Sequence, residues 1–227
     1  MDIVPESAAS KDAPARTPDK RGKKRNKPYL TPQQFELLVE LIPEPYASMV
    51  YVAIYTGLRV SELAGLRWND IGASSITIDE RPCRGDWGTA KSEASNATIG
   101  VNSCVLDRIQ RLKELTVEVR AGNAIRKYKV VKSDGPDDLV FQGVRSGGPL
   151  RDNNILVRFI KPAARSMELP WVTWRSLRTS RATWLEMADA DVKDAQAQMR
   201  HSRLSTTLDL DQQFVPESHA LLIDSAV

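Results

Sequence analysis

The first residue suited to chemistry is an arginine that directly follows a predicted helix end. In the stretch Thr56-Gly-Leu-Arg-Val-Ser-Glu-Leu-Ala-Gly-Leu-Arg-Trp-Asn-Asp-Ile71, Gly57 ends an apolar helix, because glycine adopts a left-handed C-cap without a steric penalty. Arg59 then lies on a short linker before a second helical turn. This placement predicts a guanidinium group that is held close to the core and points into a cleft. The alternative is that Arg59 caps a helix or forms an ion pair with Glu62, three residues on.

A second arginine lies near the start of another predicted helix. In Val172-Thr-Trp-Arg-Ser-Leu-Arg-Thr-Ser-Arg-Ala-Thr-Trp184, Thr173 is a suitable N-cap residue. Leu177 lies two turns before Trp184, which predicts one buried face. Arg178 projects from the same helix near its start, where backbone N–H groups also favour an anion.

These two stretches resemble the first and second boxes of the tyrosine recombinases, the phage-integrase-like enzymes that cut and rejoin DNA. The resemblance implies that Arg59 and Arg178 bind the scissile phosphate from two different elements. Two planar guanidinium groups on one phosphate are what a pentacovalent transition state needs. The resemblance also implies a tyrosine-recombinase catalytic-domain fold, mainly α with a small antiparallel β-sheet, over residues 29–218.

Three further positions take their roles from the same resemblance. Lys91 matches the hairpin lysine that enters the DNA minor groove and protonates the leaving 5′ oxygen, although a lone hairpin lysine is usually solvated. Arg175 stands where the family often has histidine; it cannot act as a base near neutral pH but can donate to the phosphate. His201, which follows Arg200 in place of the usual glycine, matches a histidine that donates to a phosphate oxygen. A lone histidine is otherwise more often structural.

The nucleophile position departs from the family. The family's frame places the nucleophilic tyrosine where this chain has Asp211, and no tyrosine occurs after Tyr128. A carboxylate is short and already anionic, so the phosphate repels it, and its attack would give an acyl phosphate that water destroys. A phosphotyrosyl bond instead preserves the bond energy for rejoining. We therefore expect strand exchange to be impaired in a chain with this sequence.

Composition and charge are typical of a soluble globular protein. The 227 residues suit one domain with extensions, and 41% are hydrophobic and 27% charged. The net charge of +3 is uneven, because residues 1–28 carry eight Lys/Arg against four Asp/Glu and the remainder carries 24 against 25. The body is therefore not basic overall, and any phosphate site must be a local cluster.

The two ends of the chain differ from the body. We predict that residues 1–28 are a disordered tail or linker, whose basic run either solubilises the chain or contacts the DNA backbone. Residues 219–227 are predicted to be a C-terminal tail; in the family such tails pack onto a neighbouring subunit, which suggests a homo-oligomer on DNA. The start lacks the features of a signal peptide, and the longest apolar run is too short to span a bilayer. We therefore predict a cytoplasmic protein without a membrane partner.

The elements that must position these residues follow from hydrophobic periodicity. Thr31, Pro32 and Gln34 predict a capped helix start, and Ile76 and Ile78 alternate with polar residues as on a strand. Residues 121–138 read as a loop or insertion, and 139–141 as a short strand or buried anchor. Helices are predicted at about 31–42, 46–57, 102–119, 152–160 with a break or kink at Pro162, 173–184 and 192–199; a second strand at 98–101; and turns at 85–88 and 147–149.

Three hypotheses for function remain open. The first is a recombinase catalytic domain that acts on double-stranded DNA in integration and recombination, with Arg59, Lys91, Arg178 and His201 around one phosphate and neither metal nor nucleotide cofactor. The two cysteines lack metal-site spacing, which agrees with this. The second is a catalytically inactive or truncated DNA-binding relative. The third is a helical interaction protein whose two boxes serve only the core.

Overall fold

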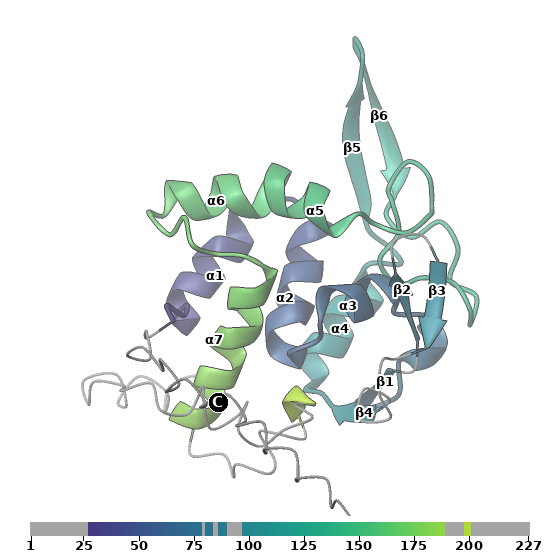
Figure 1. Cartoon of the computed structure of the whole chain (residues 1–227). Coiled ribbons are helices and arrows are strands. Elements are labelled where there is room, and N and C mark those ends of the chain that lie inside the picture. Colours follow the sequence, from purple (N-terminus) through teal and green to yellow (C-terminus); the bar gives the residue numbers. More distant parts are fainter. Residues whose placement is uncertain (1–26, 79, 84–85, 90–96, 189–197, 201–227) are drawn as a thin grey trace, which may run out of the picture.

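The computed structural model describes residues 27–78, 80–83, 86–89, 97–188 and 198–200, and it is mainly helical (Figure 1). The α-helices are α1 (Pro32–Glu40), α2 (Tyr46–Thr56), α3 (Val60–Gly65), α4 (Ser103–Arg111), α5 (Asp152–Ile155), α6 (Lys161–Ser166) and α7 (Trp174–Met187). The strands are β1 (Ser75–Ile78), β2 (Glu80–Cys83), β3 (Asp86–Thr89), β4 (Ala97–Gly100), β5 (Thr116–Ala121) and β6 (Ala124–Lys129). Among these residues the strands form three antiparallel pairs: β1 with β4, β2 with β3 and β5 with β6. The predicted fold class, mainly α with small antiparallel β-structure, is confirmed.

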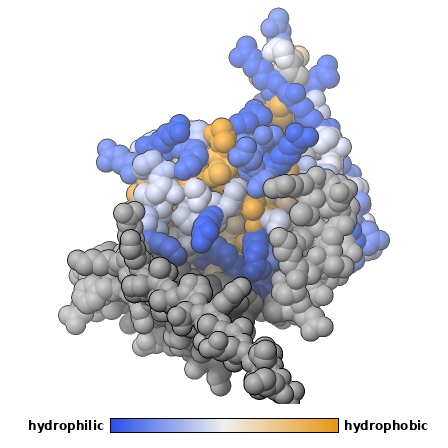
Figure 2. Space-filling model, viewed as in Figure 1, coloured by the Kyte–Doolittle hydropathy of each residue, from blue (hydrophilic) through white to orange (hydrophobic). Residues whose placement is uncertain are grey.

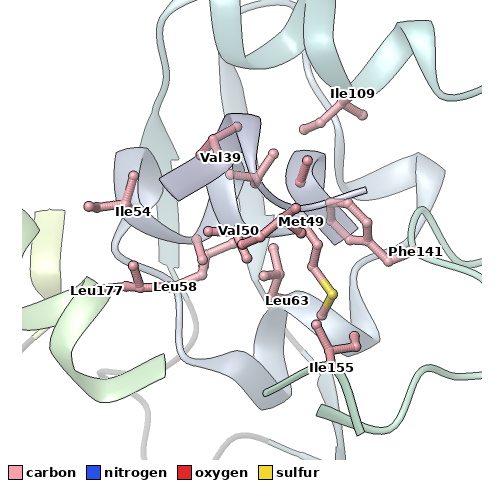
Figure 3. Packing of buried hydrophobic residues seen from close by; sticks show 14 of the residues in the cluster. Val39, Met49, Val50, Ile54, Leu58, Leu63, Ile109, Phe141, Ile155 and Leu177 are labelled. Atoms are coloured by element: carbon pink, nitrogen blue, oxygen red, sulfur yellow. The ribbon is translucent and has the colours of Figure 1, made fainter. Parts of the chain in front are cut away.

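Helix α2 runs through the centre of the helical body and is buried along most of its length. It packs against α1, α4 and α7. Its side chains Met49 and Val50 lie among Leu58, Leu63 and Phe141 in the hydrophobic core (Figure 3). A helix buried on several sides needs apolar residues all round, which agrees with the continuous apolar run in this segment. The rigid α2 core therefore fixes the position of the chain that leaves its C-terminal end.

Local signals place the starts of α1 and α7 as predicted. Thr31 accepts from the Gln34 backbone N–H at 3.2 Å, and the Gln34 side chain accepts from the Thr31 N–H at 3.0 Å. Thr173 caps α7 in the same reciprocal way with Ser176. The two helices are then tied together at Leu30, whose buried N–H donates to Ser180 Oγ at 2.8 Å.

The segment predicted as a helix over 102–119 and a loop over 121–138 is different in the structure. Helix α4 ends at Arg111, and β5 and β6 form a hairpin that projects from the body and carries mostly hydrophilic residues (Figures 1 and 2). The sequence Val117-Glu-Val-Arg120 alternates β-branched and charged residues, which favours a strand over the end of a helix. Gly122 has a φ of +64° and closes the hairpin between Ala121 and Ala124.

Two smaller predictions also need correction. Asp86–Thr89 is strand β3 rather than part of a turn over 85–88. The helix does not break at Pro162, because a π-helical segment, Leu156–Ile160, joins α5 to α6; the alternative of a kink stays a prediction. Proline removes one backbone donor and crowds the preceding turn, and the wider π turn accommodates both effects.

Candidate functional site

Arg59 is the N-cap residue of α3 and is held by the carboxylate of Glu62. Gly57 ends α2 in the left-handed conformation at φ +65°, which turns the chain directly into α3. The Glu62 Oε2 atom accepts from the Arg59 backbone N–H at 2.7 Å, and Oε1 accepts from Arg59 Nη1 at 2.9 Å. The alternative interpretation, that Arg59 caps a helix and forms an ion pair with Glu62, is therefore confirmed. The Arg59 side chain is nevertheless 38% exposed, so its guanidinium group remains accessible to a ligand.

Glu62 is buried and is shared by two arginines. Its side chain is 2% exposed, and its Oε2 atom also lies 2.7 Å from Arg200 Nη2. Burial alone raises the pKa of the Glu62 carboxyl, but the charges and hydrogen bonds of Arg200 and Arg59 outweigh it and hold this pKa below its usual value. Glu62 is therefore ionised and serves as the common counter-ion of both guanidinium groups.

Arg178 projects from the second turn of α7 toward the same place. Its Nη1 donates to the Gly57 carbonyl, and its Nη2 donates to the Met199 carbonyl. Burial, and then the charges of Arg59 and Arg200, lower the pKa of Arg178 to about 10, and the charge of Glu62 opposes them. The effect of Arg59 and Arg200 on this pKa, and the contact with Gly57 two residues before Arg59, indicate that the guanidinium groups lie in one cluster.

We use the name arginine cluster for Arg59, Arg178, Arg200 and their counter-ion Glu62. A guanidinium group carries five N–H donors, and Arg178 uses two of its nitrogens on backbone carbonyls, which fixes its plane. Three positive groups against one carboxylate leave an excess of positive charge. Such a cluster can bind a monoanionic phosphodiester through charge-assisted hydrogen bonds.

The other predicted site residues are placed only in part. Arg175 is exposed on the first turn of α7 and lines a pocket of about 240 Å³ together with Trp171 and Thr173. Within the described part of the chain, its side chain forms no hydrogen bond or ion pair with the arginine cluster. Lys91, His201 and Asp211 lie outside the described residues. The predicted tails, 1–28 and 219–227, also lie outside them except for residues 27 and 28.

Sequence reasoning did not assign a role to Arg200. It noted only that an arginine replaces the family's glycine there, whereas the structure makes Arg200 the second partner of Glu62. In the structure Arg200 has a backbone φ of +51°, which residues other than glycine rarely adopt. Within the described ranges no group of three or more His, Cys, Asp or Glu side chains could hold a metal ion. No helix in those ranges is long and apolar enough to cross a membrane.

Comparison with protein families and curated proteins supports the resemblance found in the sequence. The model of the phage integrase family matches residues 28–210. The ICEBs1 integrase of Bacillus subtilis (strain 168) is 25% identical over 202 residues, covering 85% of this chain and 52% of that protein. The tyrosine recombinase XerC of Xylella fastidiosa (strain M23) is 26% identical over 152 residues, covering 67% and 43%. The chain thus spans about half the length of the curated relatives it matches.

Solved structures share the fold. The Tn1549 transposon integrase in complex with transposon right end DNA superposes with a TM-score of 0.66 at 22% identity, covering 93% of this chain and 68% of that one. The XerA recombinase superposes with a TM-score of 0.62 at 21% identity, covering 92% and 66%. A lambda integrase dimer bound to a COC′ core site gives a TM-score of 0.57 at 16% identity, covering 82% and 48%. The predicted recombinase-type fold is confirmed.

Proposed function

Because the chain belongs to the phage integrase family, we propose that Arg59 and Arg178 of its arginine cluster bind one backbone phosphate of double-stranded DNA, and that this site belongs to the chemistry of DNA strand cleavage and rejoining. The observation that carries the proposal is the meeting of Arg59 and Arg178, which come from two separate helices. Both are oriented by protein groups before any DNA is bound. The hypothesis that the two boxes serve only the core does not account for the accessible guanidinium group of Arg59.

The geometry suits stabilisation of a transition state. During transfer of a phosphoryl group between a DNA 5′ oxygen and a protein hydroxyl, negative charge builds up on the phosphate oxygens. Donors that are already oriented stabilise this charge without reorganisation at the moment of reaction. Arg178 is fixed by two carbonyls, and Arg59 is fixed at one edge by Glu62. Loss of one such donor typically costs roughly 3–4 kcal/mol of activation free energy.

The family resemblance supplies the remaining proposed roles. Lys91 protonates the leaving 5′ oxygen, and His201 and Arg175 donate to phosphate oxygens. We also propose a homo-oligomer on DNA, which the dimeric lambda integrase with the same fold supports. The cytoplasmic location stays a prediction.

Asp211 leads to a second candidate function. With a carboxylate at the nucleophile position and no tyrosine after Tyr128, the chain would keep the phosphate cluster for DNA binding without forming the phosphotyrosyl intermediate. Such an inactive relative binds and occludes DNA sites. The two candidates share the arginine cluster and differ only in the covalent step.

A nicked suicide substrate, which traps the covalent intermediate, separates the two candidates. We expect no trapped complex with the chain as it stands and a trapped complex with Asp211→Tyr. The matched control is Asp211→Phe, which has the same ring without the hydroxyl group and must not trap DNA. If Asp211→Tyr also fails to trap DNA while it still binds the substrate, the pocket is not competent for cleavage.

DNA binding itself is tested by a salt titration with a short duplex. The affinity should fall as salt rises, and Arg59→Ala should weaken it and reduce the salt slope by about 0.9, the amount expected for one lost phosphate contact. Arg108→Gln is the control, because Arg108 forms a comparable 3.0 Å ion pair with Glu44 elsewhere on the surface. Absence of any binding at low salt would favour the third hypothesis, a helical interaction protein.

A further inference from the structure

Arg200 occupies an unfavourable position for an arginine. Its backbone has a φ of +51°, where a Cβ atom crowds the following carbonyl group. Its side chain is 1% exposed, so the guanidinium charge is removed from water. Its Nε and Nη1 atoms have no hydrogen-bond partner in the part of the chain that the structure describes. A residue in such an unfavourable conformation and environment is expected to make at least one strong compensating contact.

That contact is the 2.7 Å ion pair with Glu62. Glu62 Oε2 accepts from both Arg200 Nη2 and the Arg59 backbone N–H, while Oε1 accepts from Arg59 Nη1. The carboxylate is therefore held on one side by Arg200 and holds Arg59 on the other. Without Arg200, the flexible Glu62 side chain would keep only its two hydrogen bonds with Arg59 among the described residues.

The residue before Arg200 contacts the other half of the cluster. The Met199 carbonyl accepts from Arg178 Nη2, and the Met199 sulfur lies against the Cα side of Gly57. Residues 199 and 200 thus contact both boxes, one through a backbone carbonyl and the other through a guanidinium group. This two-residue segment is placed to set the relative orientation of Arg59 and Arg178.

We propose that Arg200 is a positioning residue, which acts through Glu62 to hold the guanidinium group of Arg59 in the orientation that binds a DNA phosphate. Because its side chain is 1% exposed, Arg200 acts on the ligand through Glu62 and not by touching it. The proposal rests on the proposed function for the nature of the ligand. The orientation of Arg59 can be tested without DNA.

The experiment measures the guanidinium signal of Arg59 and the DNA affinity in the same variants of the 227-residue chain. The Arg59 Nε–Hε resonance is observed by two-dimensional NMR without DNA and is assigned by its loss in Arg59→Lys. We expect Arg200→Gln to shift or broaden this resonance and to weaken binding of a short duplex about tenfold, the size of one charge-assisted hydrogen bond. Arg200→Lys, which retains a positive partner for Glu62, should restore part of both properties. Arg108→Gln should change neither.

The outcomes are decisive in each case. If Arg200→Gln does not fold, Arg200→Gly replaces it, because glycine suits φ +51° and removes only the side chain. An unchanged Arg59 resonance together with unchanged affinity in a folded variant would overturn the proposal. If the unaltered chain binds no DNA but the Arg59 resonance still responds to Arg200→Gln, the proposed function fails and the positioning role stands.

Discussion

Gly57 joins the two arginine boxes, and its replacement by alanine tests how tightly they are packed. Its φ is +65°, its carbonyl accepts from Arg178, and it lies two residues before Arg59. A Cβ atom at this position would lie 2.8 Å from the sulfur of Met199 and 3.6 Å from Cγ of Arg181. Gly57→Ala therefore perturbs both the backbone conformation and the contact with residue 199.

The magnitude follows from these two effects. A left-handed conformation costs an alanine about 1–2 kcal/mol. The overlap with Met199 adds about 1–2 kcal/mol, since the sulfur belongs to a flexible side chain that can shift at moderate cost. The sum is a loss of about 2–4 kcal/mol in the free energy of unfolding. For a chain of this length, that corresponds to a fall in melting temperature of about 4–16 °C.

Thermal and urea denaturation measure this loss, and Gly122→Ala is the matched control. Gly122 has nearly the same φ, +64°, but no atom lies within 4 Å of its added Cβ. In Gly122→Ala the free energy of unfolding should therefore fall by no more than the cost of the left-handed conformation, about 1–2 kcal/mol. Equal losses in the two variants would refute the packing of Met199 against Gly57. A shift of Met199 should also weaken DNA binding in Gly57→Ala and leave it unchanged in Gly122→Ala.

Three further predictions concern the groups around this junction. Glu62→Gln leaves two arginines without their counter-ion and should lower the free energy of unfolding at neutral pH by about 3–5 kcal/mol. The pKa of Glu62 in the folded state lies below its ordinary value of 4.5, so the stabilisation of the fold by the ionised carboxylate is complete above about pH 4.5 and is lost as pH falls through the folded-state pKa. Urea denaturation from pH 3 to 7 should therefore show a smaller loss of stability at acid pH in Glu62→Gln than in the unaltered chain. Ser180→Ala removes the acceptor of the buried Leu30 N–H and should cost about 1–3 kcal/mol in chemical denaturation, and a loss below 0.5 kcal/mol would contradict the importance of that bond. Arg178→Lys should weaken DNA binding at least about tenfold in fluorescence anisotropy, because one ammonium group cannot reproduce a planar guanidinium held by two carbonyls; retained affinity would argue against this role.

The parts of the fold that the sequence predicts well depend on local interactions. The capping box of Thr31 and Gln34 and the left-handed Gly57 involve residues within one turn of each other. The β5–β6 hairpin was missed, because the apolar spacing of α4 continues through Leu112 and Leu115 and the strand alternation that follows covers only a few residues.

The candidate site shows the same limit. The positions of Arg59 and Arg178 follow from their motifs, and the structure brings them into one cluster as the first two hypotheses expect. The ion pair between Arg200 and Glu62 was not predicted, since it joins residues 138 positions apart and depends on a backbone conformation that the residue type disfavours. Arg175 was predicted beside them from its motif, but the structure shows only that its side chain is exposed at the start of α7.

A buried carboxylate in a site for an anion has a physical explanation. Three guanidinium groups without a counter-ion would repel one another strongly in a partly buried site, and Glu62 lets them assemble before DNA arrives. The cluster still carries a net charge of about +2, enough to attract a phosphodiester at short range. The residues after 28 carry no net positive charge, and salt screens surface charges beyond about 8 Å at physiological ionic strength. Binding at this site should therefore depend on a few direct phosphate contacts, which predicts that the DNA affinity of a chain lacking residues 1–28 depends only weakly on salt. If the basic tail contacts DNA, the affinity of the chain with residues 1–28 should depend on salt more steeply.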